Sequence, residues 1–208
     1  MRLRDISVEL TMGTPEWPGD TPYSCGWTAS LADGSAVNLS SLTTSPHVGT
    51  HADAPIHVQD GWPGAHELPL DAFYGPAVVI DVTNATGELS FADIEPSIAQ
   101  HRLERLLLKT GASIASGAFP ESWPTLSEQC ARTLLGLGLR LLGVDAPSVD
   151  TRESKNLAVH KMLFAGGAFI VENLDLRRIQ PGAYELIALP LKVMALDAAP
   201  VRAVLIER

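Results

Sequence analysis

The chain has 208 residues, 46% of them hydrophobic, and a formal net charge of −9. This length and apolar content suffice for a sizeable buried core, so we expect residues 1–208 to form a single domain. The acidic balance and the lack of a lysine or arginine run argue against a nucleic acid or an anionic membrane as partner. The composition therefore favours a small-molecule partner.

Targeting and redox signals are sparse. Cys25 and Cys130 are the only cysteines, which is too few for a disulfide framework and typical of a reducing compartment. The first residues lack the apolar core of a signal peptide, and no run of about 18 apolar residues could span a membrane. We therefore expect a soluble cytoplasmic protein.

Strands dominate the predictions for the first third of the chain. Apolar and polar residues alternate over residues 6–10 and predict a first strand, which a proline- and glycine-rich loop around Trp17 follows. Further strands are expected near residues 26–30 and 37–44, and they lead into a cluster of histidines.

That cluster, Ser45–His57, holds three of the six histidines of the chain. Its polar groups occupy odd positions: His47, His51, Asp53 and His57. Its apolar residues occupy even ones: Val48, Ala52, Ala54 and Ile56. An extended chain would therefore present metal ligands on one face and packing groups on the other. Imidazole nitrogens with a carboxylate oxygen suit zinc or a neighbouring first-row metal.

The cluster cannot remain straight and bind one ion, because residues ten apart in a strand lie about 33 Å apart. We expect bends at Gly49, which tolerates unusual backbone angles, and at Pro55, which ends regular pairing. Alternatively, His47 and His51 could meet across one helical turn. Isolated surface or core histidines are the competing interpretation, but four such groups in this spacing favour a metal site.

Beyond residue 76 helices alternate with strands. The expected strands are residues 77–82, 103–109, 139–144, 168–172, 184–191 and 200–206. The expected helices are a short one capped by Ser90 and ending before His101, one capped at Ser127–Glu128, one near 154–164 and one at 175–179. This order predicts an α/β protein with a mixed sheet curled towards a barrel, flanked by helices.

A second metal ion would need ligands from this second half. His160 follows a helical stretch, and Glu172 ends an apolar strand, where an acidic residue is unusual unless it faces a cation. Each is weak evidence alone, because a helix-surface histidine and a strand-end carboxylate would look the same.

Four segments of the chain match the pattern of one known family: Trp17–Pro22, His47-x-Gly49-Thr50-His51-x-Asp53-x-Pro55-x-His57, Val144–Asp150 and Tyr184–Lys192. They resemble the cyclase family of metal-dependent amidohydrolases over nearly the full length, and in particular its bacterial kynurenine formamidase branch. This resemblance implies a strongly curled, swivelling β/β/α fold and a homodimer.

The resemblance also implies a two-zinc site. His47, His51 and Asp53 would hold the first ion, and Asp53 would bridge to a second ion held by His160 and Glu172, with Glu172 able to touch both. Manganese or another divalent metal is an alternative to zinc.

The implied reaction is hydrolysis of N-formyl-L-kynurenine to L-kynurenine and formate in tryptophan degradation. His57 would be the acid/base residue rather than a ligand, and Trp17 would pack on the aromatic ring of the substrate, although it could instead only anchor its loop. Two alternatives stay open: a cyclase-family hydrolase of another amide or a cyclic amide such as isatin, and a non-catalytic metal-binding relative.

Three polar residues after the expected strand 139–144 remain ambiguous: Asp145, Ser148 and Asp150. They could support the ligands or cap a turn.

Overall fold

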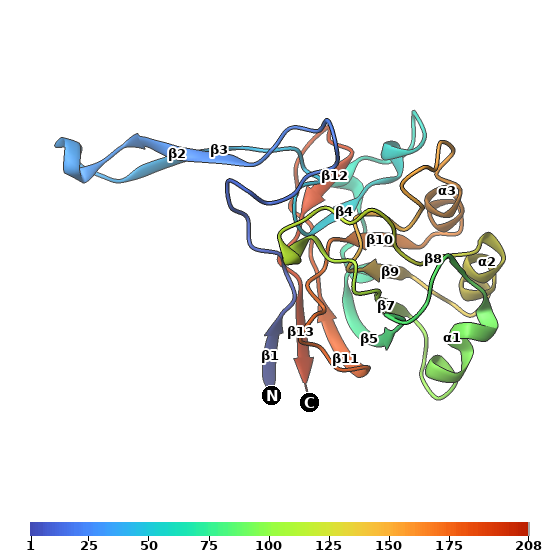
Figure 1. The fold of residues 1–208 in the computed structure, drawn as a ribbon. Helices are drawn as coiled ribbons and strands as arrows, with labels where there is room; N and C mark the ends of the chain where they lie inside the picture. Colours follow the sequence, from blue (N-terminus) through green and yellow to red (C-terminus); the bar gives the residue numbers. More distant parts are fainter. Residues whose placement is uncertain (208) are drawn as a thin grey trace.

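One strongly curled sheet of nine strands forms the centre of the computed structural model, which describes residues 1–207 (Figure 1). In spatial order the strands are β1 (Arg2–Asp5), β13 (Val204–Glu207), β11 (Gly182–Ile187), β5 (Tyr74–Asp81), β7 (Arg105–Lys109), β9 (Leu141–Val144), β10 (Phe169–Glu172), β4 (His51–Asp53) and β12 (Ala198–Pro200). The four strands β5, β7, β9 and β10 run parallel, and all other pairs of this sheet are antiparallel. The predicted mixed sheet is confirmed.

Three helices lie together along one side of the sheet: α1 (Phe91–Ile98), α2 (Glu128–Gly136) and α3 (Ala158–Ala165) (Figure 1). Ser90 and Asp93 form a capping box at the start of α1, and the Ser127 hydroxyl accepts the Cys130 N–H at the start of α2. The buried sides of the helices share one apolar core with the sheet, and a second core lies on its other face. Parallel strands covered on both faces explain the continuous apolar runs in the sequence.

The curl of the sheet joins segments that are far apart along the chain. Strand β12 pairs with β4 at one edge, whereas β13 pairs with β1 and β11 at the other. Only residues 201–203 connect β12 to β13. The Ile6 N–H also donates to Ala203 O at 3.0 Å, and Ser7 bridges to Leu174. The two ends of the chain therefore complete a strongly curled half-barrel.

A separate hairpin projects away from the sheet (Figure 1). It consists of β2 (Ser24–Ala29) and β3 (Leu39–Thr43), close to the predicted ranges. Its large apolar side chains are exposed, Trp27 at 68% and Leu42 at 64%. A second small pair joins β6 (Glu88–Leu89) to β8 (Thr125–Leu126).

Several predicted boundaries are wrong. The first strand lies at Arg2–Asp5 rather than 6–10, because Ile6 is already in the core and the chain beyond it bends into a loop. Helix α3 begins at Ala158 rather than near residue 154. The predicted strand 200–206 is two strands.

The predicted helix at residues 175–179 is a turn. The Asp175 carboxylate accepts the backbone N–H and the guanidinium of Arg177, which offers the backbone an alternative to helix. Leu176 and Ile179 are buried three residues apart, and this spacing imitates an amphipathic helix. No helix within residues 1–207 is long and apolar enough to cross a membrane.

Candidate metal centre

The histidine segment bends at both predicted places. Only His51–Asp53 is strand. Gly49 has φ +74°, a left-handed conformation in which a larger residue would be strained, and a Cβ built there would lie 2.5 Å from Leu10 Cδ2 and displace that side chain. Pro55 starts a short 3-10 turn, Pro55–His57. The two bends bring His47 and His57 back towards the strand, and His47 meets His51 through a turn rather than a helix.

Three ligand atoms converge in what we call the loop group, His47, His51 and Asp53. His47 Nδ1 lies 3.2 Å from His51 Nε2, and Asp53 Oδ1 lies 3.2 Å from each of these nitrogens. Ligands of a tetrahedral zinc ion, at bonds of about 2.0 to 2.1 Å, are about 3.3 Å apart. The triangle thus has the size of one face of such a tetrahedron.

A second set of atoms converges on the other oxygen of Asp53. This inner group consists of Asp53, His160 and Glu172. His160 Nε2 lies 3.3 Å from Asp53 Oδ2 and 3.3 Å from Glu172 Oε1. Glu172 is the cross-strand partner of His51, and its Oε2 lies 3.7 Å from His51 Nε2. Asp53 therefore presents one oxygen to each group, and Glu172 lies close to both.

The hydrogen bonds of the imidazoles indicate where their protons are. The far nitrogen of each ring meets an oxygen: His51 Nδ1 and Gly49 O at 2.9 Å, His47 Nε2 and Asp197 at 2.9 Å, His160 Nδ1 and Asp150 at 2.6 Å. We assign the N–H to these far nitrogens, the arrangement typical of metal-ligating histidines. The nitrogens that face one another then carry lone pairs, and a cation between them resolves this contact.

The buried carboxylates need positive charge beside them. Asp53, Glu172 and Asp150 are 0%, 4% and 5% exposed, and within residues 1–207 no lysine or arginine forms an ion pair with them. Asp53 Oδ1 also lacks a hydrogen-bond partner among the described residues. Buried carboxylates are costly unless they are paired or bind a metal.

The pKa shifts reflect the same charge arrangement. Burial would raise the pKa of Asp53, but the surrounding imidazoles hold it well below its usual value. Burial would lower the pKa of His160, but Asp150, Asp53 and Glu172 hold it well above its usual value. Without metal, protons on imidazoles balance the carboxylates, and the donor set fits a divalent cation that would replace them.

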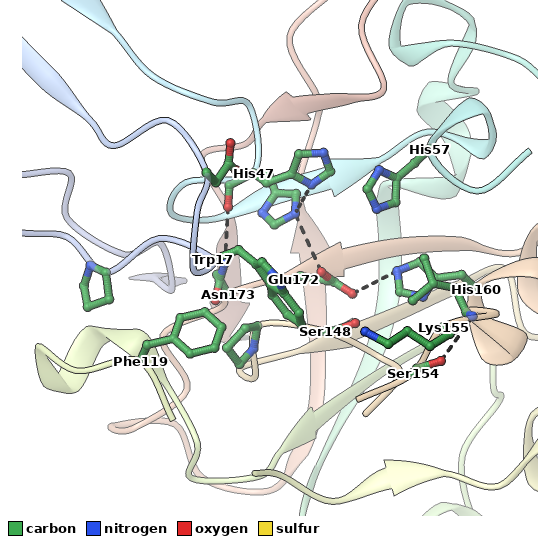
Figure 2. A pocket seen from close by; sticks show the side chains of 15 residues that line it. Trp17, His47, His57, Phe119, Ser148, Ser154, Lys155, His160, Glu172 and Asn173 are labelled. Atoms are coloured by element: carbon green, nitrogen blue, oxygen red, sulfur yellow. Dashed lines mark hydrogen bonds and ion pairs between the residues drawn. The ribbon is translucent and has the colours of Figure 1, made fainter. Parts of the chain in front are cut away.

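The cluster opens on a cavity of about 390 Å³. Imidazoles and Glu172 form one wall, and Trp17 and Phe119 form the opposite one (Figure 2). Trp17 contacts Phe119 and Trp123 edge-on at centroid distances of 5.4 and 6.2 Å, yet it remains 38% exposed. Trp17 therefore anchors its loop and also offers surface to the cavity.

His57 lies beside the ligand groups but outside them. Its Nδ1 is 3.0 Å from Asp197 Oδ2. The centroid of its ring is 4.5 Å from that of His47 and 6.0 Å from that of His160. Figure 2 shows its ring on the side of the cavity that His160 also lines.

Asp145, Ser148 and Asp150 differ in which of the two expected roles, ligand support or turn capping, they fill. Asp150 has both, since it binds His160 Nδ1 and also accepts the backbone N–H groups of Val159 and His160 at the start of α3. Asp145 accepts N–H groups of Thr110 and Gly111 and caps that turn.

Ser148 lines the cavity, and its hydroxyl accepts the Asp150 N–H.

Sequence reasoning missed Asp197, Phe119 and Lys155, which stand in segments with no ligand-like spacing.

A curled α/β sheet with paired His/carboxylate groups beside a cavity defines a protein with a metal cofactor and a small-molecule site. The Cyclase family model matches residues 4–151. A kynurenine formamidase from Bordetella avium is 41% identical to this chain, over 99% of this chain and 98% of the relative. A kynurenine formamidase from Salinibacter ruber is 42% identical, over 99% of this chain and 97% of the relative. This chain belongs to the Cyclase family.

Solved structures agree in fold. One described as a predicted metal-dependent hydrolase from Bacillus stearothermophilus has a TM-score of 0.82 and 28% identity, covering 98% of this chain and 97% of that one. An isatin hydrolase from Ralstonia solanacearum also has a TM-score of 0.82, at 20% identity, over 99% of this chain and 92% of that one. At 20% identity, the similarity to the isatin hydrolase concerns the fold alone.

Proposed function

We propose that this chain hydrolyses N-formyl-L-kynurenine to L-kynurenine and formate, and that residues 1–208 act as one unit. The observation that carries this proposal is the pair of ligand groups sharing Asp53, beside a histidine outside both groups. The kynurenine formamidases at 41% and 42% identity have this activity in their names, and the aromatic wall suits an aryl substrate.

We propose zinc as the metal, with one ion in the loop group and one in the inner group. The support is a donor set of three imidazole nitrogens and two carboxylates, with one Asp53 oxygen facing each group. Such ions supply hydroxide at neutral pH and stabilise negative charge on a carbonyl oxygen, which hydrolysis of a weakly electrophilic amide requires. Manganese is the alternative that metal analysis would detect.

In this proposal His57 moves the proton. Cleavage of the C–N bond releases an aromatic amine that must gain a proton, and imidazole accepts and returns protons near neutral pH. The contact of His57 Nδ1 with Asp197 leaves Nε2 as the atom available to the substrate.

Trp17 and Phe119 would hold the aryl ring by stacking and edge contacts and would exclude water from the reacting amide.

Measuring kynurenine absorbance during turnover of N-formyl-L-kynurenine tests the proposal. His57→Ala should retain about two zinc ions per chain and lose roughly 10²- to 10⁴-fold in kcat. His101→Ala is the matched control, since His101 follows α1 and does not line the cavity. Loss of zinc from His57→Ala would make His57 a ligand. Zinc-loaded wild type without turnover would refute the formamidase activity, and isatin would be the next substrate tested.

We also propose a homodimer that forms through the β2–β3 hairpin. An isolated two-stranded hairpin is marginally stable, and this one exposes Trp27, Leu39 and Leu42, which a second copy would cover. Trp27→Ser combined with Leu42→Ser should shift the solution mass from dimer to monomer, as light scattering would show. A wild-type monomer at micromolar concentration would refute the dimer.

A further inference from the structure

Asp197 links the loop group to His57. Its Oδ2 lies 2.9 Å from His47 Nε2 and 3.0 Å from His57 Nδ1. One carboxylate oxygen has two lone pairs and can accept both N–H groups.

The backbone fixes where Asp197 lies. Its carbonyl accepts the Ala54 N–H at 2.8 Å, and the next residue, Ala198, pairs with Asp53 across β12 and β4. The carboxylate is thus held by the same strand pair that carries the shared metal ligand, although its side chain is 44% exposed.

The trio His47, His57 and Asp197 could itself be considered a cation site, since its donor atoms lie close together. The His47 ring argues against this. A neutral imidazole has one lone-pair nitrogen and one N–H, and in the proton arrangement assigned above the lone pair is on Nδ1, which lies 3.2 Å from His51 Nε2 and from Asp53 Oδ1. Nε2 therefore carries the hydrogen, and Asp197 is its acceptor rather than a fellow ligand.

We infer that Asp197 is a positioning residue that orients a metal ligand and the acid/base histidine together; the catalytic half of this inference rests on the proposed function. Accepting the Nε2–H of His47 would leave the lone pair of Nδ1 for a metal ion in the loop group. Accepting the Nδ1–H of His57 keeps the lone pair on Nε2, which is the atom left to serve the leaving amine. A single carboxylate thus sets the tautomers of both rings.

Two substitutions test this role. Asp197→Ala removes the acceptor, and Asp197→Asn keeps a carbonyl oxygen that can still accept both N–H groups. We expect Asp197→Ala to lower the affinity for one of the two zinc ions about 10- to 100-fold. Chelator competition measures this affinity and requires no turnover. At saturating zinc its kcat should fall on the order of 10- to 100-fold with KM changed less than about threefold.

Asp197→Asn should recover much of the zinc affinity and part of kcat. Asp60→Ala is the matched control, because Asp60 is an exposed carboxylate in the loop after His57 and does not line the cavity. Wild-type zinc affinity and kcat in Asp197→Ala would overturn the inference, and so would a rise in KM with kcat intact. Inactive wild type would refute the formamidase activity alone, because chelator competition would still report on His47.

Discussion

The loop group and the inner group share Asp53 but are built differently. The loop group lies within one short segment, residues 47–53, and its His47 side chain is 19% exposed. The inner group joins β4, α3 and β10, and the His160 and Glu172 side chains are only 2% and 5% exposed. One group is thus a local bend at the cavity rim, and the other exists only because distant elements pack together.

Their supporting contacts differ as well. In the loop group, Gly49 O and the half-exposed Asp197 hold the histidines. In the inner group, Asp150 holds His160 while the Val149 N–H donates to Glu172 Oε1 at 2.8 Å. Buried hydrogen bonds are less weakened by water, so we expect the inner group to bind a metal ion more tightly than the loop group.

Replacing Asp53, the ligand that both groups share, should disable the loop group and the inner group together. Asp53→Asn keeps the shape but removes the charge that both groups use, so we expect both ions to be lost and kcat/KM to fall at least about 10³-fold. Metal content by mass spectrometry and turnover of N-formyl-L-kynurenine would check this. An Asn variant that keeps two ions would contradict the bridging role of Asp53.

Removing one histidine from each group should separate them. His47→Ala should leave about one ion per chain and a folded protein, because the inner group is untouched. His160→Ala should lose the inner ion and also stability, on the order of 3 kcal/mol, because it leaves buried carboxylates uncompensated. Zinc stoichiometry and urea unfolding of the metal-free proteins would test this, and equal unfolding midpoints for the two variants would count against it.

A smaller effect is expected at Asp150. Asp150→Ala removes the acceptor of the His160 Nδ1–H, which should lower the affinity for one zinc ion about 10- to 100-fold. It also removes the acceptor for two backbone N–H groups of α3, which should cost about 1 kcal/mol. Chelator competition and urea unfolding measure the two effects separately. Unchanged zinc affinity would leave Asp150 with the helix-capping role alone.

The smallest effect concerns the wall opposite both groups. Trp17→Phe retains an aromatic ring, whereas Trp17→Ala removes it, so only the alanine variant should raise KM, by roughly five- to tenfold, with zinc content unchanged. Steady-state kinetics of the two variants would decide. If the alanine variant lost stability but kept its KM, Trp17 would be a loop anchor only.

Much of the fold could be predicted because most signals are local. Continuous apolar runs predicted the central strands, and Ser90 and Ser127 marked the starts of α1 and α2. The errors fall where tertiary contacts decide: Ile6 enters the core just after its strand ends, and a side-chain turn at Asp175 replaces an expected helix.

By itself the sequence predicted a metal site in the segment His47–His57, because its ligand-type side chains are close enough along the chain for bends to bring them together. The family resemblance was needed to separate His47, His51 and Asp53 from His57 as one ligand set. His160 and Glu172 could be recognised as candidates from the sequence only as weak, isolated signals, with the family resemblance to connect them. Tertiary structure alone decided the role of Asp197, because nothing in its local sequence marks it. It reaches both histidines only because β12 pairs with β4 at the edge of a strongly curled sheet.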